Sequence, residues 1–315
     1  MQNHASTLAA EFKLDAARVA ATVALIDEGN TIPFIARYRK EATGSMDDQT
    51  LRALDERLSY LRKLDDQKET VHNSITEQGA MTPEIAAALE KAKTLAEVED
   101  IYRPYKPKRK TRASIARARG LEPLAARLLE QRPEDEPALL ARQYITEEVP
   151  DTEAALAGAR DILAEGFSDS ANLRATLRSL YNATALVESK AAKKDTDSVY
   201  SGYYDYSEPA AKMAGHRILA VDRGEREGFL KVSVTVDAAR AVRLLTERTV
   251  KNDSPSAEQV RAAAEDAYVR LIHPSLEREV RAGLTERACE GAISVFSKNL
   301  RQLLLQPPIK GKVAL

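Results

Sequence analysis

Apolar residues recur at intervals of three and four along most of this chain, a spacing that places them on one face of an α-helix. The clearest stretch begins at Asp47 or Asp48, typical N-cap residues, and runs to Gly79. Its apolar positions are Leu51, Leu54, Leu58, Leu61, Leu64, Val71 and Ile75. At about 1.5 Å per residue this helix would be roughly 45 Å long, so we expect it to pack against an antiparallel neighbour that starts at Pro83.

The same signals predict shorter helices elsewhere. One helix should begin after Asp15 and end at Gly29, and a short one should follow Pro33. Capping residues and apolar spacing indicate further helices over residues 94–102, 113–119, 123–132, 152–165, 170–192, 237–249, 256–273 and 275–306. We therefore expect a mainly helical chain with short connections.

The helical pattern changes near residue 196. Four tyrosines, Tyr200, Tyr203, Tyr204 and Tyr206, are expected to anchor this segment to helices more readily than to stack on bases. Residues 217–221 and 229–236 then predict two strands of a β-hairpin, because the second alternates apolar and polar side chains and glycines lie between them. After two prolines, residues 309–315 resemble a first strand without a partner, so we expect the chain to stop where a further domain begins.

Composition agrees with a helical fold and excludes several classes of protein. Aromatic residues make up only 5% of the chain, and strands favour such residues. The balance of 47 Lys+Arg against 48 Asp+Glu excludes a globally basic nucleic-acid-binding protein, although a local basic run is compatible with it. The single cysteine, Cys289, excludes a disulfide framework and a cysteine-based zinc cluster. With no long apolar run and no secretory signal, we expect a soluble cytoplasmic protein without a membrane partner.

The strongest chemical signal is a basic run between residues 102 and 119, which contains no acid. Prolines stiffen its beginning, its cations could neutralise phosphates and its tyrosines could stack on bases. We assign as candidate nucleic-acid-binding residues Arg103, Lys106, Lys108, Arg109, Lys110, Arg112, Tyr102 and Tyr105. Two plainer interpretations stay open: a solvated loop, or a loop that docks on the acidic stretch 130–153.

Two further segments have weaker signals. Residues 112–130 predict a pair of helices with the shape of a helix-turn-helix, because Ala116 and Gly120 supply the small residue and the positive-φ turn. Only Arg127 of the second helix could reach a base edge, so we expect a packing pair without direct sequence reading. Phe34 and Tyr38, beside a small basic group at 37–40, are expected to pin their helix onto the first one.

Catalytic chemistry has little support in the sequence. There is no glycine-rich phosphate loop and no serine in a nucleophile-elbow context. The acids at 97–100 and 134–136 have no neighbouring base or pocket, and Cys289 lies beside Glu290, a poor setting for a reactive thiolate. We therefore expect no enzymatic activity, no metal and no cofactor.

Five stretches are similar to motifs of a known family. Residues 27–41, DEGNTIPFIARYRKE, resemble the hallmark stretch of the bacterial Tex family of RNA-binding transcription accessory proteins. The other similar stretches are 98–112 (VEDIYRPYKPKRKTR), 204–209 (YDYSEP), 223–228 (RGEREG) and 303–308 (LLLQPP). Together they span essentially the whole chain in family order.

The resemblance implies more than this chain contains. Tex proteins are longer and continue into an RNase-H-like domain that is considered inactive, helix-hairpin-helix units and a C-terminal OB-fold RNA-binding module. The main nucleic-acid-binding surface implied by the family would then lie in domains absent here. A eukaryotic relative implied by the resemblance is a transcription elongation factor that also handles histones.

These features together predict a mainly α fold, an elongated multi-helix scaffold with helix-turn-helix-like packing and one small β-hairpin. We divide it into a Tex-like N-terminal helical domain over 1–195 (its helix-turn-helix-like part about 47–132), a tyrosine-rich segment with the hairpin over 196–250, and C-terminal helices over 251–315. The expected function is a non-catalytic scaffold that contacts RNA or DNA mainly through absent domains, with auxiliary phosphate contacts and a link to the transcription machinery. The alternative is a protein-interaction platform that docks a transcription or ribosomal partner without touching nucleic acid.

Overall fold

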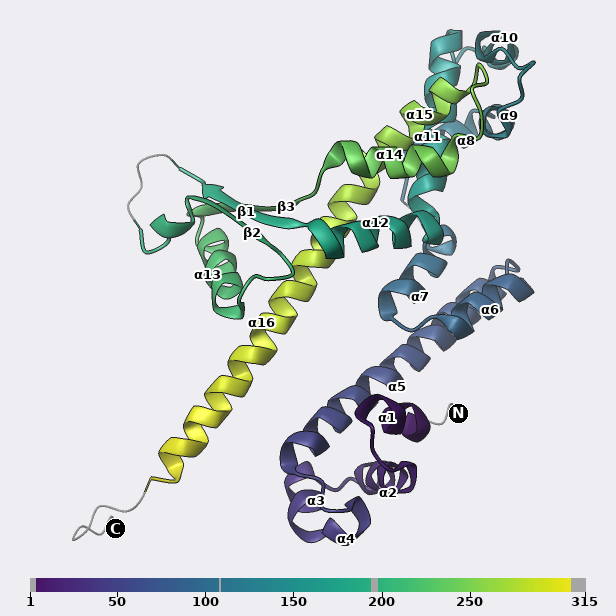
Figure 1. Cartoon of the computed structure of the whole chain (residues 1–315). Helices are drawn as coiled ribbons and strands as arrows, with labels where there is room; N and C mark the ends of the chain where they lie inside the picture. Colours follow the sequence, from purple (N-terminus) through teal and green to yellow (C-terminus); the bar gives the residue numbers. More distant parts are fainter. Residues whose placement is uncertain (1–3, 108, 194–197, 307–315) are drawn as a thin grey trace, which may run out of the picture. The chain divides into compact units, whose positions relative to one another are not determined.

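The computed structural model describes residues 4–107, 109–193 and 198–306 (Figure 1). The chain folds into two compact units, residues 1–106 and 107–315. The expected mainly α fold is confirmed, and its small β element is a three-stranded antiparallel sheet where a β-hairpin was expected. The divisions that the sequence suggested near residues 195 and 250 stay a prediction.

A long helix organises the first unit. The helices of this unit are α1 (His4–Phe12), α2 (Ala16–Asp27), α3 (Ile32–Tyr38), α4 (Lys40–Thr43), α5 (Asp48–Glu77), α6 (Pro83–Lys91) and α7 (Leu95–Tyr102). Helix α5 begins as predicted after Asp47, whose carboxylate accepts a hydrogen bond from the Thr50 amide at 2.7 Å. All seven of its predicted apolar positions are buried. They pack against α1, α2 and α3 toward its beginning and against α6 and α7 toward its end.

The second unit is built around α11. Its helices are α8 (Arg112–Ala118), α9 (Glu122–Glu130), α10 (Pro137–Ala141), α11 (Thr152–Asp169), α12 (Ala171–Thr184), α13 (Gly215–Arg226), α14 (Ala238–Thr249), α15 (Ala257–Asp266) and α16 (His273–Leu304). A π-helical turn, Ala267–Ile272, joins α15 to α16. Helix α11 contacts α8, α9, α10 and α15, and half of its residues are buried, so its side chains form the centre of the larger core.

Three short strands form an antiparallel sheet in this unit. They are β1 (Leu186–Ala191), β2 (Asp205–Pro209) and β3 (Leu230–Thr235), in the order β2-β1-β3. Val187 of the central strand pairs with Glu208 on one side and Val234 on the other. Both valines are buried, and the strand β3 contacts α13 and α16.

Side chains close the outer edge of β3. The amide of Val234 donates to the Glu277 carboxylate at 2.8 Å, and the amide of Val232 donates to Glu225 at 3.3 Å. The guanidinium of Arg281 donates to the Val232 carbonyl at 3.4 Å. These side chains bind backbone N–H and C=O groups of the β3 edge that would otherwise be free to pair with another strand.

Two predictions for this region are wrong. The helix expected over 170–192 ends at Thr184, and residues 186–191 form β1. The first strand of the expected hairpin, 217–221, lies in α13, where Ile218 and Val221 share the buried face. A short apolar run is compatible with either structure, and here the neighbouring surfaces decided between them. The predicted second strand exists as β3, but it pairs with β1. The strand expected over 309–315 lies outside the described residues.

Candidate nucleic-acid interface

The first part of the basic run closes the first unit. Tyr102 is the last residue of α7, and its hydroxyl lies 3.0 Å from the Ser74 hydroxyl. Tyr102 and Tyr105 are half-buried and pack against the cluster around Leu64 and Val71. Their rings therefore contribute to the core of this unit. Arg103 follows in a 3-10 turn and is also half-buried.

Lys106 ends this part of the run. Its ammonium nitrogen lies 2.7 Å from the Glu99 carboxylate, and both side chains are exposed to solvent by 52% and 39%. An exposed ion pair of this kind contributes little to stability. The lysine can therefore exchange Glu99 for another anion at small cost.

The remaining candidate cations belong to the second unit. Arg109, Lys110 and Arg112 are exposed. Among the residues that the structure describes, none has an ion pair with any of these three side chains. Lys108 lies outside the described residues. Within the described residues, the cations of the run that have no ion-pair partner therefore follow residue 108.

A buried carboxylate holds the end of the run in place. Thr111 caps α8, where it exchanges hydrogen bonds with Ser114 at 2.8 and 3.0 Å. Its hydroxyl donates to Glu165 of α11 at 3.0 Å, and the Arg117 guanidinium donates to the same carboxylate at 2.6 Å. Glu165 is only 8% exposed. The sequence reasoning missed this residue, and the only signal was an acid on the otherwise apolar face of α11.

Helices α8 and α9 follow as a tightly connected pair. Gly120 in the connection has a φ of +76°, and Leu121 beside it is buried. Arg127, the residue that could reach a base edge, donates instead to the Asp135 carboxylate at 2.8 Å and lies 3.3 Å from Glu130. The Asp135 carboxylate holds the pKa of the Arg127 guanidinium above its ordinary value. Helices α8 and α9 therefore pack as a pair against α11, and the expectation that they do not read sequence stays a prediction.

Phe34 and Tyr38 do not have the packing role expected of them. Ile32 and Ile35 take the buried face of α3, so the two rings point outward and are 41% and 61% exposed. The prediction that they pin α3 onto the preceding helix is wrong, because a helix of seven residues has only one face against its neighbours and the isoleucines occupy it.

The tyrosines near residue 203 anchor their segment, as the sequence analysis favoured. Tyr200 is buried, and its hydroxyl donates to the Glu227 carboxylate at 2.8 Å. Burial and this carboxylate raise the pKa of the Tyr200 hydroxyl. Tyr203 and Tyr206 meet edge to face with ring centroids 5.2 Å apart. Both rings are half-buried against the larger core, so their faces are not free to stack on bases.

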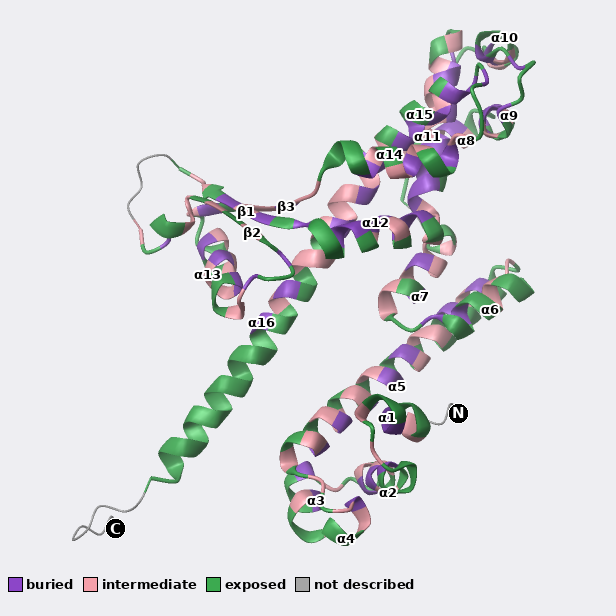
Figure 2. Cartoon of the chain, viewed as in Figure 1, coloured by how far each residue is buried: buried purple, intermediate pink, exposed green. Residues whose placement is uncertain are grey.

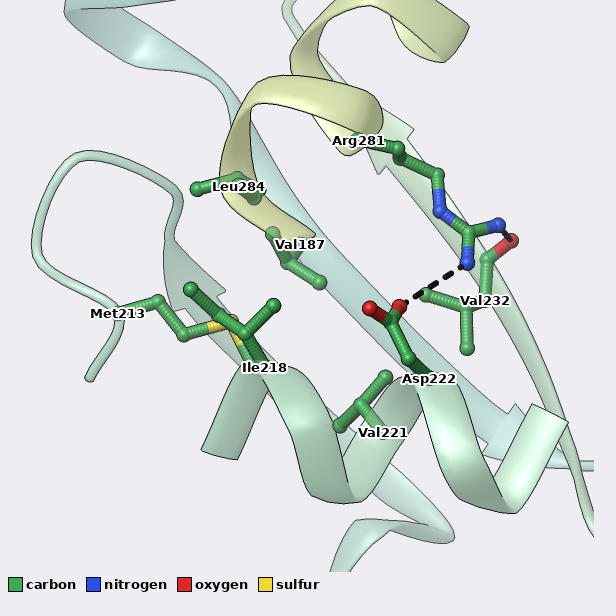
Figure 3. Close-up of a pocket in the computed structure, with 8 residues that line it drawn as sticks. All are labelled: Val187, Met213, Ile218, Val221, Asp222, Val232, Arg281 and Leu284. Carbon is green, nitrogen blue, oxygen red and sulfur yellow. Dashed lines mark hydrogen bonds and ion pairs between the residues drawn. The ribbon is translucent and has the colours of Figure 1, made fainter. Parts of the chain in front are cut away.

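A cavity between α13, α16 and the sheet is too small for a substrate (Figure 3). Its volume of about 10 Å³ is room for one water molecule. Val187, Ile218 and Leu284 line it, and Arg281 reaches Asp222 across it at 3.5 Å.

A wider hollow of about 360 Å³ lies beside α16. Burial raises the pKa of the Tyr181 hydroxyl on its wall, and this hydroxyl lies 2.5 Å from Nδ1 of His273. The Glu279 carboxylate there is bound by Arg178, and Arg287 donates to the Ala210 carbonyl at 3.3 Å. Glu279 and Arg287, the charged groups that line this hollow, are therefore already bound by other residues of the protein. In the described part of the chain, no three histidine, cysteine or acidic residues gather in a way that could bind a metal ion.

Over the described ranges, none of the helices combines the length and the apolar character that crossing a bilayer requires.

Comparisons with known proteins match nearly all of the sequence. The family described as Tex-like protein N-terminal domain matches residues 2–76, and the family described as Tex central region-like matches residues 132–296. An uncharacterized Bacillus subtilis protein, YdcI, is 45% identical over 98% of this chain and 44% of its own length. Protein tex of Bordetella pertussis is 40% identical over 98% of this chain and 41% of its own length.

A human relative is more distant. S1 RNA-binding domain-containing protein 1 of Homo sapiens is 31% identical over 92% of this chain and 31% of its own length. This chain therefore spans less than half the length of these curated relatives.

Proposed function

This chain belongs to the Tex family, and on that premise we propose that it is a non-catalytic helical scaffold within a cytoplasmic, nucleic-acid-associated transcription accessory protein. The names of two relatives support this role: one from Neisseria gonorrhoeae is a transcriptional accessory protein, and the human one has an S1 RNA-binding domain. The scaffold role is supported mainly by the exposed apolar side chains of the second half of α16.

The second half of α16 is an amphipathic helix in contact with solvent. Residues 289–306 are all exposed, in contrast to the buried Leu276, Leu284 and Ala288 earlier in the helix (Figure 2). The exposed apolar side chains of this half that share one face are Cys289, Ala292, Ile293, Phe296, Leu300, Leu303 and Leu304. Ile293 and Phe296 are each 68% exposed.

The spacing of these residues is that of a helix that packs against another element. Cys289, Ile293, Phe296, Leu300 and Leu303 follow one another at intervals of four, three, four and three, which is the seam of a packed helix pair. Exposing an apolar stripe of this length to water costs about 25 cal/mol of free energy for each Å² of apolar surface. We infer that the additional polypeptide of the longer relatives packs on this face, so that α16 joins the two parts.

A chimera tests the scaffold role. Residues 1–315 of this chain replace the matching 44% of the Bacillus subtilis relative, and peptide-level hydrogen exchange is compared with the chain alone. Residues 293–304 should exchange roughly tenfold or more slowly in the chimera, because packing protects the amides. Peptides from α11 serve as the control, since they are buried in both proteins. Equal exchange of residues 293–304 in the two proteins would contradict the scaffold role.

A second function is favoured by the free cations of the basic run. We propose that Arg103, Lys106, Lys108, Arg109, Lys110 and Arg112 add phosphate contacts to nucleic acid, with Tyr102 and Tyr105 shaping the beginning of the run. Support comes from the exposed side chains of Arg109 and Lys110, which have no ion pair within the described residues, from the exposed side chain of Arg112, which lies near the Asp161 carboxylate, and from the Glu165 contact that holds Thr111 among them. Ionic contacts of this kind are independent of sequence and sensitive to salt.

Replacement of Lys108, Arg109 and Lys110 by alanine should flatten the salt dependence of binding. Each lost phosphate contact lowers the slope of log K against log[salt] by about 0.7 to 0.9, and affinity is measured by fluorescence anisotropy with a short RNA or DNA duplex. The matched control replaces Arg240, Arg243 and Arg248, three exposed arginines of α14. An unchanged slope in the first triple variant, or no binding at any salt, would favour the protein-interaction platform instead.

A further inference from the structure

The segment from α3 to the start of α4 carries two exposed aromatic rings and two exposed cations. We propose that this surface, made by Phe34, Arg37, Tyr38 and Lys40, binds a segment of single-stranded nucleic acid by stacking its bases and neutralising its phosphates. The inference rests on the proposed nucleic-acid role and adds a second contact, with a different physical basis, to the basic run.

The two rings are positioned as a stacking platform. The centroids of Phe34 and Tyr38 lie 5.3 Å apart at an interplanar angle of 46°, one helical turn from each other. The Phe34 and Tyr38 side chains are 41% and 61% exposed, although exposing the large apolar surface of an aromatic ring to water is unfavourable. An exposed ring accepts any base on its face, so this pair can bind successive unpaired bases without reading their sequence.

The charges beside the rings match a polyanion. Between residues 34 and 41 there are three basic side chains and one acid. The acid, Glu41, is paired with Arg39 at 3.3 Å. Arg37 and Lys40 are exposed, and neither has an ion pair with another residue within the described ranges. The guanidinium of Arg37 lies over the Tyr38 ring, 6.0 Å from its centroid, so a positive charge accompanies this ring.

The surface is rigid although α3 is short. Ile35 is fully buried and packs in one cluster with Leu25 of α2 and Leu51 of α5. After α4, Gly44 ends the segment with a φ of +66°, and the Arg18 side chain lies so close to it that a Cβ there would be within 2.5 Å. The rings therefore project from a backbone that is held on its other side, and little conformational freedom is lost on binding.

Single strands are favoured over a duplex because the rings need open base faces. In a duplex the bases are already stacked, so only Arg37 and Lys40 could contribute there. Loss of a ring should therefore weaken binding of a single strand while leaving binding of a duplex unchanged. Loss of a cation should weaken both and reduce the salt slope.

Binding of a short single-stranded RNA and of a duplex of the same sequence to the whole chain tests this inference. Tyr38→Ala and Phe34→Ala should each weaken single-strand binding by about fivefold to a hundredfold, which is the effect of losing one stacked base, and the salt slope should not change. Tyr38→Phe should bind as the unchanged chain does. The control is Phe296→Ala, a phenylalanine of α16 that is 68% exposed and lies outside the proposed surface, and it should have no effect. Circular dichroism confirms that the variants remain folded.

The two nucleic-acid proposals fail differently. If the alanine variants at 108–110 lose binding and the Tyr38 and Phe34 variants do not, the stacking surface is wrong and the basic run stands. If only the ring variants lose single-strand binding, the stacking surface stands alone. If the unchanged chain binds neither probe at any salt, both are wrong, and the α3 surface belongs to a protein interface instead.

Discussion

Replacement of Glu165 by alanine is expected to lower the free energy of unfolding of the second unit by about 2 to 3 kcal/mol. The carboxylate is 8% exposed and accepts hydrogen bonds from Thr111 at 3.0 Å and Arg117 at 2.6 Å. Its loss removes the acceptor of the Thr111 hydroxyl, leaves Arg117 with only the longer contact to Glu122, and opens space under the start of α8. Urea unfolding followed by circular dichroism measures the change.

The chain offers a matched control for this prediction. Glu122 also pairs with Arg117, at 3.6 Å, but its side chain is 68% exposed. Glu122→Ala should change the free energy of unfolding by less than about 0.5 kcal/mol, because exposed ion pairs contribute little. If the two variants are equally stable, burial of Glu165 does not hold α8. Glu165→Ala should also leave nucleic-acid binding by the α3 surface unchanged, because Glu165 and α3 lie in different units.

Replacement of Gly158 by leucine is expected to cost about 3 kcal/mol or more. A Cβ at this position of α11 would lie 2.4 Å from Cδ1 of Leu121 and 3.4 Å from the Ala116 Cβ. Leu121 is 1% exposed, so it has little room to move away. The glycine therefore allows the α8–α9 connection to approach α11 closely, and a larger side chain would separate them. The same unfolding experiment measures this loss.

A substitution at a second glycine of α11 distinguishes the effect of packing from the effect of helix propensity. Gly166 has no atom within 4 Å of an added Cβ, so Gly166→Leu should be neutral or stabilising by up to about 1 kcal/mol. In the double variant Gly158→Leu, Leu121→Ala the cost should be smaller than the sum of the two single costs, because the clash is removed. Strict additivity would show that the contact with Leu121 is not the cause.

The sequence was most informative where the signal is local. Asp47 caps α5 and Thr94 caps α7 as their side chains predict, because a cap depends on neighbouring residues alone. The Tex resemblance also came from contiguous motifs, and the family matches confirm it. The candidate cations were visible in the same way, although the assignment of each to phosphate contact stays a prediction.

Sequence reasoning was weaker where a choice depended on distant partners. Residues 217–221 suit a strand or a helix, and they form α13 because Ile218 and Val221 fit the core against β3 and α16. The orientation of Phe34 and Tyr38 was misjudged because hydrophobicity alone does not say which of two apolar faces is buried.

Local patterns in the sequence were enough to predict a mainly helical protein, the bounds of α5, the family and the position of the basic run. All of these depend on interactions between residues a few positions apart. Tertiary packing was needed to establish the pairing of β1 with β3, the burial of Glu165 under α8, and the exposure of the α3 rings and of the second half of α16. These depend on which surfaces meet, and that is settled by the summed packing of segments far apart in the chain.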